Sequence, residues 1–309
     1  MCSAMDMNEL LNRRFRRLEY VMRPFLSLGS VAVCHSQRGV GKTHFGLGLA
    51  YAAATANVFL MWQGDRPFRV LYIDSKTQGK VLQERLAKIM GSAQNKPDDG
   101  FLGIIAPDLC EGFMPDLTTR QGQARIANEC SRAELIVLDC IPSYPTRSVR
   151  NESEGSPWPE VVEWVSTLKA SGKAVLLILP SDKNGNPKGL PVGWSVPDVT
   201  ICLMQPQDYK PSEGARFDVV FKTAGPDAQP FEACLDEDCT GKQTWTIKPL
   251  ARSRPEQVKE MVSLGRTAQE IAAELGVDVA TVYRELKKLG MSLKASTRGR
   301  GKGMTKTGR

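Results

Sequence analysis

The stretch Ser36-Gln37-Arg38-Gly39-Val40-Gly41-Lys42-Thr43 is the most informative part of this 309-residue chain. In a phosphate-binding loop, glycines let the backbone approach the phosphates, a lysine reaches their terminal oxygens and a hydroxyl meets Mg²⁺. The stretch contains all of these parts, although Ser36 stands where such loops usually begin with glycine. Residues 30–34 read as a buried strand and residues 44–55 as a helix rich in small residues. We therefore predict that ATP binds at Ser36, Arg38, Gly39, Val40, Gly41, Lys42, Thr43 and His44, with no motif that separates ATP from GTP.

The composition is that of a soluble globular protein, with 41% hydrophobic and 24% charged residues. No apolar segment is long enough to span a bilayer and no signal peptide begins the chain, so we expect a cytoplasmic protein without a membrane partner. The 8 cysteines are scattered and the 2 histidines lie beside the phosphate loop, which leaves little material for a zinc site. A net charge of +7, concentrated near both ends, favours a polyanionic partner.

Apolar segments alternate with helical ones after the phosphate loop. Strands are expected at residues 68–74, 103–106, 135–139 and 174–179, and helices at 79–90, 122–132 and 159–170. Strands that are apolar on both faces indicate a parallel sheet covered by helices on both sides. The runs 199–204, 217–222, 231–235 and 244–247 are expected to add antiparallel strands at one edge. Two long loops, residues 143–158 and 182–197, are expected to face a ligand or partner.

The chain divides into four predicted parts. Residues 1–28 form an arm, and residues 7–22 of it read as an amphipathic helix that either docks on a neighbouring subunit or packs on its own domain. Residues 29–251 form the nucleotide-binding domain. A composition break at residues 252–255 precedes a small all-α domain, residues 255–290, and a basic tail, residues 291–309. The predicted fold class is therefore α/β, a mostly parallel sheet with antiparallel edge strands, plus a small helical domain.

Asp139 ends the apolar strand of residues 135–139. A P-loop nucleotide site needs a carboxylate at such a strand end to hold Mg²⁺ through water, together with the hydroxyl of the loop. We predict Thr43 and Asp139 as the magnesium site.

The C-terminal helices carry a second motif. Segments 256–263, 267–275 and 278–289 are short and helical, Thr267 and Asp278 are good N-caps, and Gly276 sits at a turn. Their pattern resembles a helix-turn-helix of the resolvase or sigma-factor type, which would present Thr281, Tyr283, Arg284 and Lys287 to the DNA major groove. The alternative is a helical cap that stabilises the main domain or an oligomer. The basic tail favours DNA, unless it only keeps the protein soluble.

The order of these motifs over residues 20–250 resembles the RecA-like ATPases of the plasmid-encoded RepA helicase type, some of which end in a helix-turn-helix. The resemblance implies a RecA-like core and a homo-oligomer, a hexamer that moves on single-stranded DNA during replication of plasmids and related elements.

Three positions depart from that family pattern. Lys76 stands where the family has a glutamate that polarises the attacking water, and a lysine carries the opposite charge. Leu179-Pro180-Ser181 ends the strand that should carry sensor histidines, and residues 187–191 lack the arginine expected to reach the next subunit. Asp74 is near enough in sequence to replace the glutamate. Lys183 or Lys188 could replace the missing arginine and reach a neighbouring subunit's phosphate. Lys76 either stabilises the bound γ-phosphate or is a solvated surface lysine.

The sequence thus favours an ATP- and Mg²⁺-binding, DNA-binding protein of a plasmid or mobile element, in which the nucleotide controls assembly on DNA and hydrolysis is weak or absent. One alternative is an active RepA-like hexameric helicase and ATPase, with Asp74 and a lysine in the missing roles. A second is a helix-turn-helix transcriptional regulator whose P-loop domain is structural.

Overall fold

The computed structural model describes residues 4–15, 17–141, 158–182, 185–188, 190, 197–223, 229–250, 254–263 and 265–291. Most of the two predicted long loops, Lys183 and the basic tail from residue 292 lie outside these residues. The chain separates into two compact units, Met1–Pro249 and Leu250–Arg309, which we describe one at a time.

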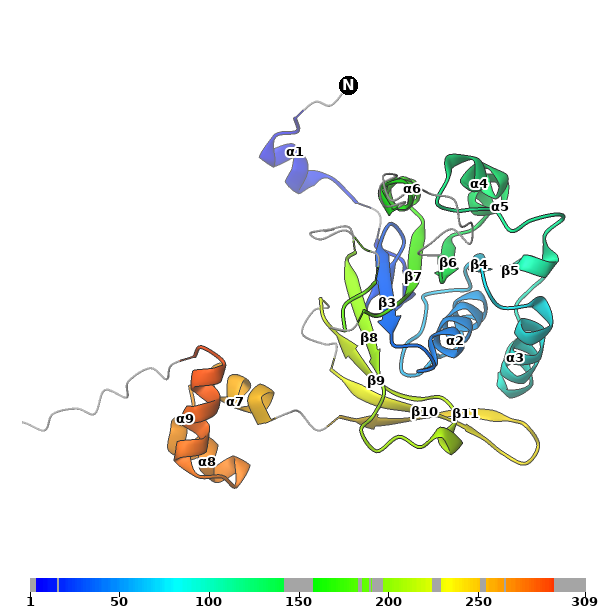
Figure 1. The fold of residues 1–309 in the computed structure, drawn as a ribbon. Coiled ribbons are helices and arrows are strands. Elements are labelled where there is room, and N and C mark those ends of the chain that lie inside the picture. Colours follow the sequence, from blue (N-terminus) through cyan, green and yellow to red (C-terminus); the bar gives the residue numbers. More distant parts are fainter. Residues whose placement is uncertain are drawn as a thin grey trace, which may run out of the picture. The chain divides into compact units, whose positions relative to one another are not determined.

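In its described part, the first unit is built on a nine-stranded sheet with the order β11–β10–β9–β8–β3–β7–β6–β4–β5 (Figure 1). From β8 to β5 the strands run parallel: β8 (Val199–Met204), β3 (Val31–Ser36), β7 (Ala174–Pro180), β6 (Leu135–Asp139), β4 (Val70–Asp74) and β5 (Leu102–Ile105). The antiparallel edge consists of β9 (Arg216–Phe221), β10 (Phe231–Glu237) and β11 (Gln243–Pro249). This mostly parallel sheet with an antiparallel edge confirms the predicted α/β class and is consistent with a RecA-like P-loop core.

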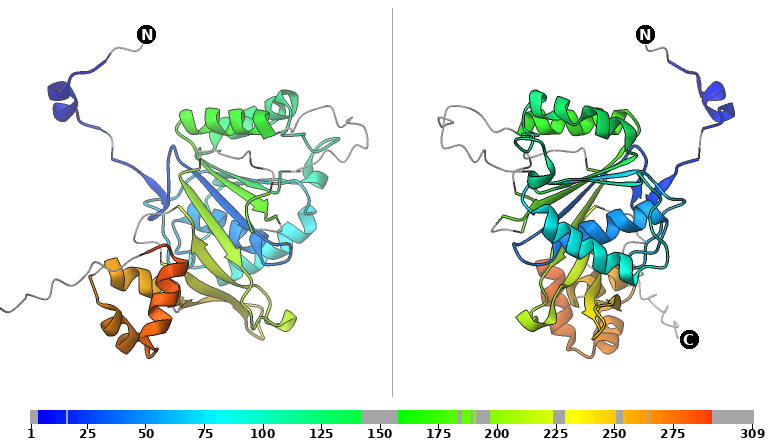
Figure 2. Two further views of the ribbon diagram at one scale, coloured as in Figure 1. Left: turned by 60° about the vertical axis from the view of Figure 1, so that its left-hand side comes forward. Right: turned by 90° about the vertical axis from the view of Figure 1, so that its right-hand side faces the viewer.

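Helices cover both faces of the sheet (Figure 2). On one face lie α2 (Lys42–Thr55) and α3 (Gly79–Ser92), and on the other α4 (Arg120–Arg125), α5 (Ala127–Arg132) and α6 (Trp158–Ala170). The strands supply both cores by alternation: Ala32 and Cys34 of β3 face the α2 side, whereas Val31 and Val33 face the α6 side. Two short 3₁₀ helices, η1 (Pro107–Leu109) and η2 (Pro211–Glu213), lie in connections.

The prediction that residues 199–204 run antiparallel is wrong. β8 pairs in parallel with β3, and Val33 lies opposite Thr200. An apolar run looks the same in either direction, so direction depends on the connection. The connection from β7, residues 181–198, is long enough to cross over and return the chain parallel to β3.

The expected helix at residues 7–22 is also wrong beyond its first turns. α1 covers Met7–Asn12 and buries no residue, whereas Tyr20–Met22 forms β1, which pairs with β2 (Leu26–Ser27). Asp65 holds this segment extended, because it accepts a hydrogen bond from the Tyr20 amide at 3.0 Å and pairs with Arg23 at 2.6 Å. The helix expected at residues 122–132 is likewise divided into α4 and α5 at Ile126, which has φ −109° and ψ 6°.

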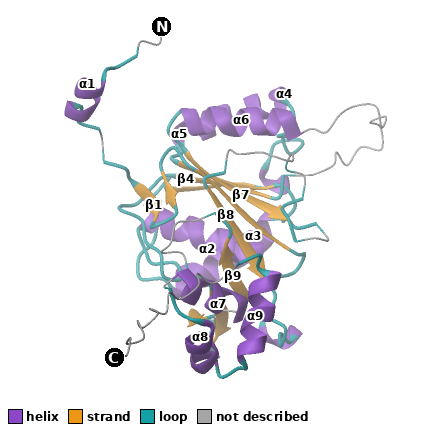
Figure 3. Cartoon of the chain, turned by 90° about the vertical axis from the view of Figure 1, so that its left-hand side faces the viewer, coloured by secondary structure: helices purple, strands orange, loops and turns teal. Residues whose placement is uncertain are grey.

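The second unit consists, in its described residues, of α7 (Arg254–Ser263), α8 (Ala268–Leu275) and α9 (Val279–Lys288), all labelled in Figure 3. They enclose a small core of Val258, Ala268, Ile271, Ala272, Val282 and Leu286. Thr267 forms a capping box with Glu270 at the start of α8, and Gly276 ends that helix at φ 62°. Asp278 occupies the N-cap of α9, but its side chain makes no capping hydrogen bond. None of the helices in the described chain is long and apolar enough to cross a bilayer.

Candidate nucleotide-binding site

The predicted phosphate loop connects β3 to α2 at the carboxyl edge of the parallel strands. Gly39 has φ 89° and Gly41 φ 121°, conformations that other residues rarely adopt, so both positions require glycine. Val40 is buried and anchors the loop between them. The amides at the start of α2 form the positive end of the helix dipole, where a phosphate binds favourably.

Lys42 lies over this loop. Its Nζ donates to the Ser36 carbonyl and Ser36 Oγ, both at 3.0 Å, and to the Gln37 carbonyl at 2.8 Å. Burial lowers the pKa of Lys42, and nearby Asp139 opposes that shift. Ser36 therefore orients the lysine, although glycine is usual at this position. A bound phosphate oxygen would be a charged acceptor for the same ammonium.

Two carboxylates meet beside the loop, because β4 and β6 are neighbours and Asp74 lies opposite Asp139 in their register. Both side chains are buried. Asp139 accepts hydrogen bonds from the Tyr72 hydroxyl at 2.7 Å and from the Thr43 hydroxyl. Burial, and then the charge of Asp74, raise the pKa of Asp139 to about 6.

The structure thus brings together the two predicted magnesium ligands, Thr43 and Asp139. In the described part of the chain, no cluster of three or more histidine, cysteine or acidic side chains is arranged to hold a metal by itself. An ion between Thr43 and Asp139 would therefore need phosphate oxygens to complete its shell, which is how P-loop proteins hold Mg²⁺.

Asp74 and Lys76 occupy different environments. Asp74 Oδ1 accepts from the backbone amides of Lys76 and Thr77, both at 2.8 Å, while its Oδ2 is buried without a hydrogen-bond partner among the residues that the structure describes. Lys76 is exposed, and its charge slightly lowers the pKa of Lys42. A carboxylate oxygen is therefore present beside the predicted magnesium ligands, while an exposed lysine occupies the position of the expected glutamate.

A buried imidazole lies next to the end of β7, where sensor histidines were expected. His35 of β3 contacts Ser181 Oγ through Nδ1 at 2.9 Å, and its Nε2 is buried without a partner among the described residues. Burial, and then Lys222 and Lys42, lower the pKa of His35 to about 4, so the ring is neutral near pH 7. The sequence places His35 beside the phosphate loop but does not reveal its contact with Ser181, which depends on the pairing of β3 with β7.

A groove of about 320 Å³ borders the phosphate loop between α3 and the edge strands. Its wall contains His44, Arg85, Lys88, Gly214, Ala215 and Glu237. Burial, and then Arg85 and Lys88, lower the pKa of His44 to about 4. A Cβ added to Gly41 would lie 3.1 Å from the Phe217 ring of β9, which shows how closely the edge strand approaches the loop. Apart from His44, sequence reasoning missed these residues, because they come from segments far apart in the chain and carry no motif.

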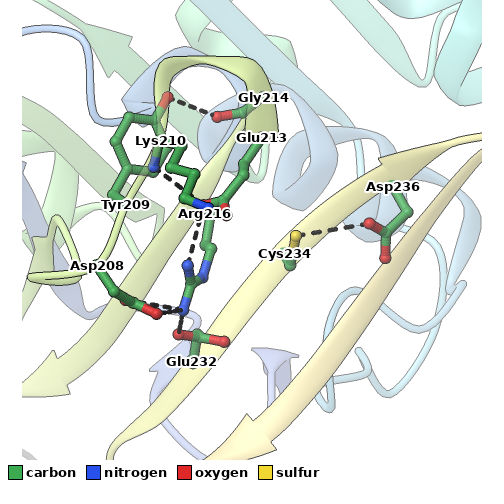
Figure 4. A network of polar contacts seen from close by, with 9 residues as sticks. All are labelled: Asp208, Tyr209, Lys210, Glu213, Gly214, Arg216, Glu232, Cys234 and Asp236. Atoms are coloured by element: carbon green, nitrogen blue, oxygen red, sulfur yellow. Dashed lines mark hydrogen bonds and ion pairs between the residues drawn. The ribbon is translucent and has the colours of Figure 1, made fainter.

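An ion-pair network fixes the start of β9 beside this groove (Figure 4). Arg216 pairs with Asp208 at 3.0 Å, Glu213 at 2.9 Å and Glu232 at 2.7 Å, and its side chain is only 15% exposed. The hydrogen bonds that Arg216 donates to Glu232, Glu213 and Asp208 raise its pKa, so it stays charged. Arg216 is thereby directed inward, so it is not available as the arginine that would reach a neighbouring subunit's phosphate. Lys188, one of the predicted substitutes, is exposed.

The predicted DNA-binding residues share one side of α9. Tyr283, Arg284 and Lys287 are exposed and Thr281 is half-buried, whereas Val282 and Leu286 on the other side enter the core of the second unit. The helix therefore presents a hydroxyl, a phenol and two cations outward.

Comparison with known proteins agrees with the phosphate loop. No curated protein sequence matches this chain. The KaiC-like protein PH0186 from the hyperthermophilic archaeon Pyrococcus horikoshii OT3 is a similar structure, with 13% sequence identity, a TM-score of 0.46, and coverage of 74% of this chain and 94% of that one. Residues 2–186 match the family model described as AAA domain. Because this match covers more than half of its length, the chain belongs to the AAA-domain family of P-loop ATPases, whose fold implies nucleotide binding.

Proposed function

We propose that this protein binds ATP with Mg²⁺ and binds DNA, and that the nucleotide controls its assembly on DNA while hydrolysis is slow. The observation that carries the proposal is the grouping of Lys42, Thr43 and Asp139 around the phosphate loop, with Lys76 exposed at the position of the expected glutamate. Binding needs the first three groups, whereas fast turnover needs a group that positions water.

In this proposal the phosphates lie on the amides of the loop and the base enters the groove beside it. Ser36, Arg38, Gly39, Val40 and Gly41 form the cradle, Lys42 meets the terminal phosphates, and Thr43 and Asp139 hold the ion. His44 and Arg85 line the groove, and the imidazole ring of His44 and the planar guanidinium of Arg85 can stack on a base. The bound ion would favour the ionised form of Asp139, whose pKa near 6 makes binding sensitive to pH.

The second unit, residues 255–290, is proposed as a helix-turn-helix in which α9 enters the major groove. Support comes from the exposed side of α9, where Thr281, Tyr283, Arg284 and Lys287 lie opposite the core. Two cations on this helix and a basic tail fit a phosphate backbone. The RepA-like relationship, the mobile-element role and a homo-oligomer, a hexamer by the resemblance, belong to the same proposal.

An active ATPase is the second candidate, and it is favoured by Asp74 Oδ2, which has no hydrogen-bond partner in the described part of the chain. This oxygen lies in the register position next to Asp139, so it is a candidate acceptor for the attacking water. The two functions differ in turnover: a binding protein holds ATP, whereas an ATPase releases phosphate and responds to DNA.

The test measures ATP turnover, with and without single- and double-stranded DNA, beside equilibrium binding of a fluorescent ATP analogue. We expect binding without appreciable turnover in the wild type, loss of binding in Lys42→Ala, and gain of turnover in Lys76→Glu. Lys96→Glu reverses the charge of another exposed lysine and serves as the control. DNA-stimulated turnover in the wild type, lost in Asp74→Asn, would replace the proposal with the ATPase.

DNA binding is tested separately by the affinity of the full chain for DNA. Arg284→Ala and Lys287→Ala should weaken binding and reduce its salt dependence. Sequence-specific binding that persists in Lys42→Ala and ignores ATP would instead indicate a transcriptional regulator with a structural P-loop domain. Equal DNA binding by wild type and both α9 variants would refute the role of α9.

A further inference from the structure

A second cavity, of about 460 Å³, lies farther along α2 from the phosphate loop. Its walls come from α2, residues 57–60, the end of α3 and the β10–β11 hairpin. It shares His44, Leu235 and Gln243 with the groove beside the loop, and otherwise has its own lining. Its volume is in the range of pockets that hold small molecules.

Aromatic rings line this cavity. Tyr51, Phe59 and Trp245 contribute to the wall, and the rings of Phe59 and Trp245 lie 5.8 Å apart at 86°. Gly48 allows Phe59 to pack directly on α2, because a Cβ at that position would collide with the Phe59 ring. The Tyr51 hydroxyl is held by the Asn95 carbonyl at 2.9 Å. The rings are therefore fixed in place before any ligand arrives, which lowers the entropic cost of binding an aromatic molecule.

The charged side chain in the lining of the cavity, Lys242, is positive. No carboxylate is among the residues that line it. Burial raises the pKa of Tyr51, so its phenol is neutral near pH 7. Lys242 is exposed at the wall, and its ammonium makes no ion pair among the described residues. Asp238, the acidic residue nearest to Lys242 along the hairpin, is not among the lining residues, and its Oδ1 accepts hydrogen bonds from the Thr240 and Lys242 amides at 2.8 and 3.0 Å. Glu237 pairs with Lys88 at 2.8 Å. A cationic ligand would find no counter-charge in this wall, whereas an anion would find Lys242.

We propose that this cavity is a second small-molecule site, distinct from the phosphate loop, for an aromatic molecule with one negative charge. The rings of the bound molecule lie among Tyr51, Phe59 and Trp245, and its carboxylate or sulfonate contacts Lys242. Because His44 follows the magnesium ligand Thr43 and lines both spaces, occupation of this site changes the affinity for ATP, and ATP changes the affinity for the aromatic anion by the same factor.

The test uses 8-anilinonaphthalene-1-sulfonate as the probe and the full chain. Its fluorescence increase gives affinity and stoichiometry, and 1-anilinonaphthalene, which has the same rings without the sulfonate, reports the contribution of the charge. We expect one sulfonate probe per chain, and about tenfold weaker binding in Lys242→Glu with little change for the uncharged probe. Lys248→Glu is the matched control, since Lys248 is an exposed lysine of the same hairpin and does not line this cavity.

A second variant, Ala52→Trp, fills the cavity from α2 and should abolish the binding of both probes. If that variant does not fold, Trp245→Ala takes its place and should weaken the binding of both probes. Several weak probe sites that respond equally to the two charge reversals would overturn the proposal. Complete displacement of the probe by ATP in the wild type, absent in Lys42→Ala, would also overturn it, because the cavity would then hold the base of the bound nucleotide. Retained binding with a shifted affinity supports the second site.

Discussion

Replacing Tyr72 with phenylalanine should move the pH at which magnesium and nucleotide bind. Tyr72 is buried, burial keeps its pKa well above the ordinary value, and its hydroxyl donates to Asp139 at 2.7 Å. This hydrogen bond favours the ionised form of Asp139, against the burial and the Asp74 charge that raise its pKa to about 6. Since Mg²⁺ needs the ionised carboxylate, binding falls as the pH drops through that pKa.

The size of the shift follows from the lost hydrogen bond. A hydrogen bond to a charged group contributes about 1.5–3 kcal/mol, and one pKa unit corresponds to about 1.36 kcal/mol. Tyr72→Phe should therefore raise the pKa of Asp139 by about 1–2 units, to between roughly 7 and 8. At pH 7 the affinity for Mg²⁺ and nucleotide should fall between about twofold and tenfold, and at pH 8.5 most of it should return.

The assay is equilibrium binding of a fluorescent ATP analogue between pH 5.5 and 8.5, with Mg²⁺ and with EDTA. The nucleotide titrates too, but it is the same for both proteins, so the difference between their midpoints reports on the protein. Tyr51→Phe is the control, because its hydroxyl donates to the Asn95 carbonyl instead. Equal midpoints for wild type and Tyr72→Phe would refute the reasoning, as would an equal shift in EDTA.

Three further predictions concern stability. The pKa of Asp139 in the folded chain lies above its ordinary value of 3.8, so its ionisation opposes folding. Asp139→Asn should therefore raise the free energy of unfolding by about 1–3 kcal/mol at pH 7.5, and this gain should be absent below pH 3.8, where both states of the wild type are protonated. Denaturant titrations that give a gain independent of pH would contradict this prediction. Gly46→Val should cost about 1–3 kcal/mol, because a Cβ at Gly46 collides with Ile178, whereas the exposed Gly91→Val should lack that collision cost; equal melting temperatures for the two variants would show that the helix can move away. Thr267→Ala removes the capping box of α8 and should destabilise the second unit by about 1 kcal/mol, measured by amide hydrogen exchange in α8, and unchanged exchange would show that the cap contributes nothing.

The local features of this protein can be predicted from its sequence. Gly39, Gly41 and Lys42 predict the phosphate loop because the required backbone conformations and charge belong to those residue types alone. Apolar strands alternating with helices predict a covered parallel sheet, and Thr267 and Gly276 mark the ends of α8. Such signals act over a few residues, so they can be recognised without knowing what lies across the sheet.

Only the tertiary structure determined how distant segments meet. The direction of β8, the break at Ile126 and the extended conformation of Tyr20–Met22 depend on pairings and packing that an apolar pattern does not encode. The same holds for the candidate site: Asp74 lies beside Asp139 because β4 and β6 are neighbours, and Arg216 faces inward because three carboxylates surround it. Strand order and side-chain partners arise from contacts between residues far apart in the chain, and the free energy of those contacts appears only when the whole sheet has formed.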